Sequence, residues 1–123
     1  MWMKSVLAID DEQIVRISCE RILRGAGYDI DTSADGQNAL KMIEAKKYDV
    51  ILTDLKMPGM DGLEVMSEIK KRLPGTKVII VTGYSTVDTA ARAMKMGAHI
   101  YIEKPFSPES LVAAVQDALG EKV

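Results

Sequence analysis

Acidic side chains stand directly after two apolar runs of this sequence. Asp10 and Asp11 follow residues 6–9, and Asp54 follows residues 50–53. A continuous apolar run is typical of a buried parallel strand, and ligands of open α/β sheets sit beyond the carboxyl ends of such strands. These acids are therefore expected at the edge of the sheet where such folds have their functional sites. Asp54 could instead do no more than cap the turn that follows it, because aspartate often bonds backbone N–H groups of turns.

Two further polar side chains end apolar segments in the second half of the chain. Thr82 closes the run 77–81, and Lys104 follows residues 100–103. Because all carboxyl ends of a parallel sheet lie at one edge, we expect Thr82 and Lys104 to meet the three acids there. Clustered carboxylates repel each other unless a positive charge sits among them, and Mg2+ prefers oxygen ligands. The cation, the ammonium group and the hydroxyl together predict a binding site for a phosphoryl group. Catalysis of phosphoryl transfer is mainly positioning and charge neutralisation.

The spacing of apolar residues predicts the elements that must position this set. Strand patterns lie at residues 6–9, 28–33, 50–53, 77–81 and 100–103, and helical patterns at 13–25, 35–46, 63–73, 85–96 and 107–119. Such alternation, with short connections, predicts right-handed crossovers and a parallel sheet between two layers of helices. The weaker second strand suits an edge position. Ser85 and Asp88 resemble a capping box at the start of the fourth helix.

Composition restricts the class of protein. With 123 residues, the chain has the commonest size of a single domain, so we expect one domain over residues 1–123. Its net charge of -2 argues against direct binding of nucleic acid. Cys19 is the sole cysteine, which rules out an intrachain disulfide and predicts a packed thiol on an apolar helix face. We expect a cytoplasmic protein, because no signal-peptide core or membrane-spanning stretch is found.

The order and context of these motifs resemble the receiver domain of response regulators in bacterial two-component signalling. The resemblance runs from Lys4 to about Leu119 and rests on Asp10-Asp11, on Asp54 with Met57-Pro58-Gly59-Met60-Asp61-Gly62, on Thr82-Gly83 and on Lys104-Pro105-Phe106. It implies a flavodoxin-like α/β fold, a doubly wound five-stranded parallel sheet of order 2-1-3-4-5 with five helices. It also implies a phospho-accepting signalling protein that catalyses only its own phosphorylation and dephosphorylation.

The resemblance assigns a role to each residue of the set. Asp54 is implied to accept a phosphoryl group from a phosphohistidine of a sensor histidine kinase. Asp11, Asp54 and the backbone carbonyl of Lys56 would ligate Mg2+, and Asp10 would act mostly through a metal-bound water. Lys104 would pair with the phosphoryl oxygens.

The resemblance further implies a switch. The Thr82 hydroxyl would move toward the phosphoryl group, and Tyr101 would turn from an outward to an inward rotamer, which reshapes the surface of the last two helices and the strand between them. Phosphorylation-dependent dimerisation through that surface is expected. The Lys104–Pro105 peptide bond is expected to be cis and to place the lysine stem. Lys56 and Tyr84, each two residues beyond a key group, are expected to tune the lifetime of the acyl phosphate.

Other functions could use the same residues. A Mg2+-dependent phosphohydrolase with an aspartyl nucleophile would share the carboxylates, but enzymes of the haloacid dehalogenase type show a second aspartate where this chain has Lys56. A purely structural interaction module would not need the complete set. A nucleotide-binding fold is disfavoured because no glycine-rich loop follows the first strand. The segments 82–85 and 103–107 are similar to receivers attached to ATPase and DNA-binding modules that activate transcription, which leaves the output open.

Overall fold

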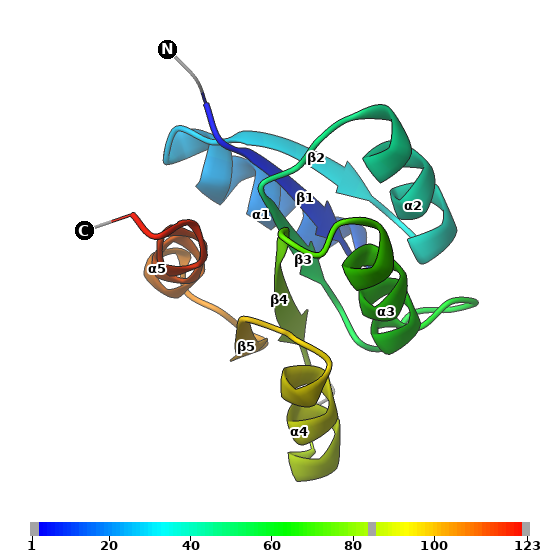
Figure 1. Cartoon of the computed structure of the whole chain (residues 1–123). Coiled ribbons are helices and arrows are strands. Elements are labelled where there is room, and N and C mark those ends of the chain that lie inside the picture. Colours follow the sequence, from blue (N-terminus) through cyan, green and yellow to red (C-terminus); the bar gives the residue numbers. More distant parts are fainter. Residues whose placement is uncertain (1–2, 84–85, 122–123) are drawn as a thin grey trace.

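The sheet and its helices alternate along the whole chain. A computed structural model describes residues 3–83 and 86–121 (Figure 1). The elements are β1 (Ser5–Ile9), α1 (Gln13–Gly25), β2 (Asp29–Ser33), α2 (Gly36–Ala45), β3 (Val50–Thr53), α3 (Gly62–Arg72), β4 (Lys77–Thr82), α4 (Val87–Lys95), β5 (Ile100–Glu103) and α5 (Pro108–Leu119). The strands pair in parallel in the order β2-β1-β3-β4-β5. The predicted flavodoxin-like fold is confirmed, with β2 at an edge.

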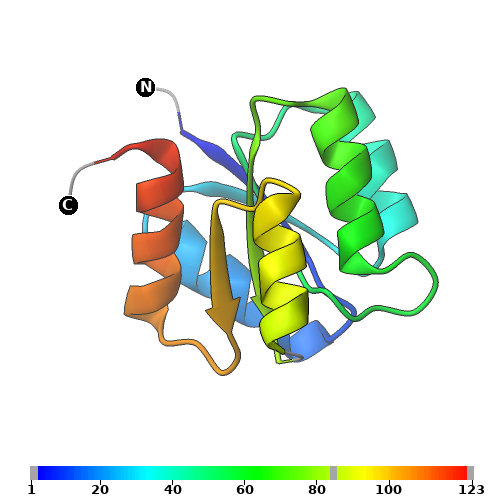
Figure 2. The ribbon, with the colours of Figure 1, turned by 60° about the horizontal axis from the view of Figure 1, so that its bottom comes forward.

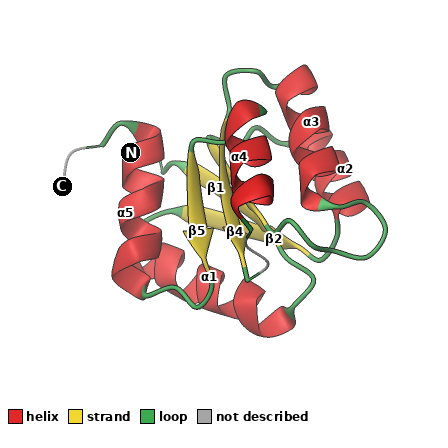
Figure 3. Cartoon of the chain, turned by 90° about the horizontal axis from the view of Figure 1, so that it is seen from below, coloured by secondary structure: helices red, strands yellow, loops and turns green. Residues whose placement is uncertain are grey.

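Two layers of helices cover the sheet. Helices α1 and α5 pack on one face, and α2, α3 and α4 pack on the other (Figure 3). Central strand β3 has no exposed face: Val50 and Leu52 lie in the core toward α1 and α5, whereas Ile51 lies in the core toward the other three helices. A strand buried on both faces needs apolar residues at every position, which explains the unbroken apolar run.

Short polar side chains fix the start of four helices. Each accepts a hydrogen bond from the backbone N–H three residues later, which satisfies one otherwise unpaired donor of the first helical turn: Asp35, Asp61, Thr86 and Ser107. These caps set where each chain segment turns from the sheet edge into a helix. The polar residues at the strand ends are thereby kept in short, well-defined loops.

The start of α4 differs from the prediction. Thr86 caps this helix, and Thr89 donates its backbone N–H to Thr86 Oγ1 at 3.1 Å while its own Oγ1 accepts from the Thr86 N–H at 3.0 Å. The predicted pairing of Ser85 with Asp88 is therefore wrong by one position. Ser85 itself lies outside the described residues, as does Tyr84. A threonine at the third helical position closes the box here, because its hydroxyl reaches back to the N–H of the cap residue.

Helix α4 is the least embedded of the helices. Among its described residues only Ala93 is buried, whereas Val87 is 88% exposed. Figure 2 shows β5 between α4 and α5 at the end of the sheet. Within residues 3–83 and 86–121, no helix is both long and apolar enough to cross a membrane.

Candidate functional site

The ends of β1 and β3 place two aspartates side by side. The backbone N–H of Asp54 donates to the Ile9 carbonyl at 3.1 Å, and the N–H of Asp10 donates to the Ser33 carbonyl at 3.0 Å. Parallel pairing thus continues one residue beyond both strands. Since neighbouring parallel strands end at the same edge, the two carboxylates face one another although more than a third of the chain separates them. Both residues are buried.

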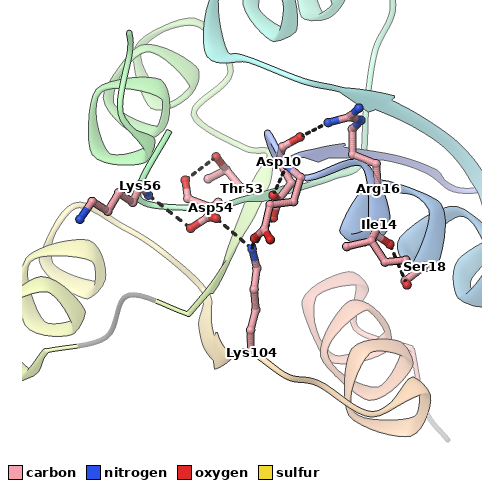
Figure 4. Close-up of polar contacts among 9 residues, drawn as sticks. Asp10, Ile14, Arg16, Ser18, Thr53, Asp54, Lys56 and Lys104 are labelled. Atoms are coloured by element: carbon pink, nitrogen blue, oxygen red, sulfur yellow. Dashed lines mark hydrogen bonds and ion pairs between the residues drawn. The ribbon is translucent and has the colours of Figure 1, made fainter. Parts of the chain in front are cut away.

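Lys104 joins these two carboxylates from the end of β5. Its Nζ lies 2.7 Å from Asp10 Oδ2 and 2.9 Å from Asp54 Oδ2 (Figure 4). The side chain of Lys104 is 13% exposed, and those of Asp10 and Asp54 are 5% and 7% exposed. The backbone N–H of Lys104 donates to the Thr82 carbonyl at 2.9 Å, and the Lys104–Pro105 peptide bond is cis. An ammonium group is therefore held between two buried acids.

Burial and ion pairing shift the pKa values of Lys104 and Asp10 in opposite directions. Burial lowers the pKa of Lys104, but hydrogen bonds to Asp10 and Asp54 outweigh it and raise that pKa above its ordinary value. Burial also raises the pKa of Asp10, although Lys104 and the Glu12 N–H oppose this. Two close carboxylates favour the charged form of Lys104. Lys104 is thus a permanent positive charge at neutral pH.

Backbone geometry orients the carboxylate of Asp54. Its Oδ1 accepts a hydrogen bond from the Lys56 N–H at 3.3 Å, while its Oδ2 contacts Lys104. Asp54 therefore caps the following turn and faces Lys104 at once, so the two sequence interpretations are compatible. Gly62 lies against the Asp54 carbonyl so closely that a Cβ atom there would overlap the oxygen, while its N–H donates to the Leu55 carbonyl at 2.8 Å. Only glycine fits at that position.

A surface cleft opens over this group. Its lining comes from the ends of four strands and the loops that follow them: Asp11, Glu12, Asp54, Lys56, Met57, Pro58, Thr82, Gly83 and Lys104. Thr82 is fully buried at the end of β4. The side chain of Lys56 points away from Asp10 and Lys104 (Figure 4). Tyr101 is partly buried, pairs with Ile80 in the sheet and packs against the core under α4 rather than lining the cleft.

Three acids of the cleft region could hold a cation. Carboxylate oxygens of Asp10, Glu12 and Asp54 lie within 4.8 Å of one another. A donor set of carboxylate oxygens suits a hard divalent ion such as Mg2+. Asp11 lines the cleft but is not in this group, so its predicted role as a ligand stays a prediction. Sequence reasoning missed Glu12, although its place two residues after Asp10 was the available signal.

Comparison with known proteins adds the family. The response regulator receiver domain family matches residues 6–116. The chain belongs to the response regulator receiver domains. These domains act in two-component signalling and generally bind Mg2+, which agrees with the acidic group at the sheet edge. The predicted family and phospho-accepting function are confirmed, and the phosphohydrolase alternative is not favoured.

Curated relatives of this receiver are longer proteins. The DNA-binding transcriptional regulator NtrC of Escherichia coli K12 is 41% identical over 115 residues, which cover 94% of this chain and 24% of NtrC. A putative NtrX-like response regulator of Rickettsia bellii is 39% identical over 120 residues, which cover 96% of this chain and 25% of that protein. The chain thus spans about a quarter of the length of these relatives.

Solved structures of receivers superpose closely on the chain. Chemotaxis protein CheY4 of Vibrio cholerae gives a TM-score of 0.91 at 32% identity, covering 96% of this chain and all of CheY4. The beryllofluoride-activated NtrC4 receiver domain dimer gives a TM-score of 0.91 at 39% identity, covering 96% of this chain and 98% of that receiver. The arrangement of sheet and helices is therefore that of solved receivers, one of which is described as a dimer.

Proposed function

We propose that Asp54 is the phospho-acceptor of this receiver and that a sensor histidine kinase supplies the phosphoryl group. The observation that carries this proposal is the contact of the buried Asp54 carboxylate with the Lys104 ammonium group at 2.9 Å, at the base of an open cleft. A carboxylate in that position is accessible from one side and has a fixed positive charge beside it. Such a pair can bind and stabilise a phosphoryl group.

Group transfer would proceed by direct displacement. A carboxylate oxygen of Asp54 forms a bond to phosphorus while the P–N bond of the donor phosphohistidine breaks. The imidazole leaves with the electron pair and is neutral without further protonation when its other nitrogen carries the proton. Lys104 stabilises the charge on the phosphoryl oxygens, because its ammonium group is desolvated and already placed beside Asp54. The chain's contribution is therefore positioning and charge neutralisation.

We propose Mg2+ as the cofactor, held by Asp10, Asp11, Asp54 and the backbone carbonyl of Lys56, with Asp10 acting mostly through water. The proximity of acidic oxygens from Asp10 and Asp54 supports this, as does the absence of softer ligands among the described residues of that group. When bound, Mg2+ would neutralise charge on the phosphoryl oxygens. Asp10 and Asp54 would orient it from two neighbouring strands.

We further propose Thr82 and Tyr101 as switch residues. Thr82 is buried beside the cleft, and its carbonyl accepts from the Lys104 N–H, so β4 and β5 are joined at the site. A phosphoryl group that attracts the Thr82 hydroxyl would favour a minor state in which the partly buried Tyr101 turns further inward. The loosely embedded α4 supports this proposal, because few buried contacts oppose its movement.

The surfaces around the cleft support two proposed partners, a kinase and a second copy of the chain. A second groove adjoins it between α1 and the β5–α5 loop, lined mainly by apolar residues such as Ile14, Val15 and Phe106, and it offers a kinase a docking surface beside Lys104. Phosphorylation-dependent dimerisation through α4, β5 and α5 is supported by the dimer of the NtrC4 receiver. We propose residues 1–123 as one receiver unit in the cytoplasm, with a transcriptional output and no direct contact with nucleic acid or membrane.

Acetyl phosphate with Mg2+ tests the phospho-acceptor proposal. Mass spectrometry of the native chain should detect one added phosphoryl group that depends on Mg2+ and is missing in Asp54→Asn. Acetate release should show a burst near one equivalent per chain, because the phosphoryl group stays on Asp54 until the acyl phosphate hydrolyses. Modification of Asp54→Asn to the same extent, or consumption of many equivalents of acetyl phosphate without accumulation of the phosphorylated chain, would overturn the proposal.

Lys56 provides a test of phosphoryl lifetime. Lys56 lies two residues beyond Asp54 and lines the cleft that opens over the Asp54 carboxylate. We expect Lys56→Ala to change the half-life of the phosphorylated chain, measured by loss of the added mass, while Lys41→Ala, at an exposed position of α2, leaves it unchanged. An unchanged half-life in Lys56→Ala would contradict this part of the proposal. The matching prediction for Tyr84 falls outside the described residues.

A further inference from the structure

Lys104 has a third acidic partner besides Asp10 and Asp54. Its Nζ lies 3.2 Å from Oε1 of Glu12, against 2.7 Å from Asp10 and 2.9 Å from Asp54. An ammonium group has three N–H donors, so these three carboxylates use its full capacity. A phosphoryl oxygen that is to pair with Lys104 must therefore displace one of them.

Glu12 holds the contact that is easiest to release. Its side chain is 58% exposed, so water can hydrate the carboxylate once it leaves Lys104. Asp10 and Asp54 are nearly covered, and each accepts a second hydrogen bond from a backbone N–H, of Glu12 and of Lys56 respectively. The contact of Glu12 is also the longest of the three. Displacement of Glu12 leaves both buried acids satisfied.

We propose that Glu12 is a positioning residue of the phosphoryl transfer: it holds Lys104 beside Asp54 in the unmodified chain and competes with incoming phosphoryl oxygens for the ammonium group. This inference rests on the proposed function of Asp54. The Glu12 carboxylate also lines the cleft, where its negative charge repels a phosphoryl group. Competition for Lys104 and charge repulsion both weaken binding of the phosphoryl group, while the nucleophile Asp54 is unchanged.

The test compares Glu12→Gln with Glu20→Gln. Both variants lose one negative charge, but Glu20 lies farther along α1 and pairs with Arg24 at 4.0 Å. The probe is beryllofluoride with Mg2+, a phosphoryl mimic, and its apparent dissociation constant is measured by NMR titration of the 123-residue chain. We expect Glu12→Gln to bind about three- to tenfold more tightly than the natural sequence at low salt, and this ratio to shrink at high salt because an exposed charge is screened.

A kinetic measurement separates positioning from a structural effect. With acetyl phosphate at saturating Mg2+, Glu12→Gln should lower the donor concentration that gives half the maximal rate of phosphorylation more than it changes the limiting rate. Equal unfolding midpoints in urea verify that the fold is intact. Equal beryllofluoride affinity in Glu12→Gln and Glu20→Gln would show the inference to be wrong while the proposed function stands. Failure of the natural sequence to bind beryllofluoride in an Asp54-dependent way would instead overturn the proposed function.

Discussion

Replacement of Lys104 by methionine removes the positive charge that Asp10 and Asp54 share. The three side chains are at most 13% exposed, so water compensates only poorly for a missing ammonium group. Removal of one partner from a buried ion pair costs about 3–5 kcal/mol, because an uncompensated charge remains. Two carboxylates lose a partner here, at 2.7 and 2.9 Å. We expect a loss of at least about 3 kcal/mol in the free energy of unfolding, or about 10 °C in Tm.

Urea unfolding followed by circular dichroism measures this loss. The experiment is done at pH 7 with a chelator, so that no divalent cation replaces the missing charge. Lys41→Met, on the exposed surface of α2, is the matched control and should change stability by no more than about 0.5 kcal/mol. Added Mg2+ should restore part of the loss in Lys104→Met, because a cation bound among the acids stabilises the folded state in proportion to the logarithm of its concentration.

The double variant Lys104→Met/Asp54→Asn checks the cause. It should be more stable than Lys104→Met alone, since one of the two uncompensated charges is gone. Equal unfolding midpoints for Lys104→Met and Lys41→Met would refute the reasoning. That result would mean that the two acids tolerate each other without an ammonium group between them.

Three further predictions concern packing and hydrogen bonding. Gly62→Ala should cost about 3 kcal/mol in urea unfolding and impair phosphorylation of Asp54, because the new methyl group overlaps the carbonyl of Asp54; native stability would contradict this. Burial raises the pKa of the Cys19 thiol from 9.0 to about 12. The unfolded chain therefore loses this proton first, and the free energy of unfolding should fall as pH rises from 9.0 to about 12. Cys19 should react with iodoacetamide only in urea. Tyr28→Phe removes a 2.7 Å hydrogen bond to Glu121 and should lower the free energy of unfolding by about 1 kcal/mol, whereas Tyr28→Phe in a Glu121→Ala background should cost less.

The sheet and most of the site could be predicted from the sequence. The apolar run before Asp54 identifies a strand buried on both faces, and parallel topology brings all strand ends to one edge. This reasoning needs no knowledge of side-chain conformations. It therefore gives the neighbourhood of Asp10, Asp54 and Lys104 correctly, because those three residues immediately follow strands.

The sequence does not predict which acid after β1 contacts Lys104 or which residue caps α4, because the candidates are neighbours in the chain. Three successive acids follow β1, and only the start of α1 at Gln13 determines that Glu12 reaches Lys104. The start of α4 has the same ambiguity, since Ser85 and Thr86 are both good caps. Thr86 is the cap in the structure because the Thr89 hydroxyl completes the reciprocal pair.

Lys104 lies 92 residues after Glu12 and 50 residues after Asp54 along the chain. A nascent polypeptide still lacking its final strand would leave the acids near β1 and β3 without their ammonium partner. The site is thus complete only after β5 has been synthesised, so a product cut short before Lys104 would be a poor substrate for a kinase.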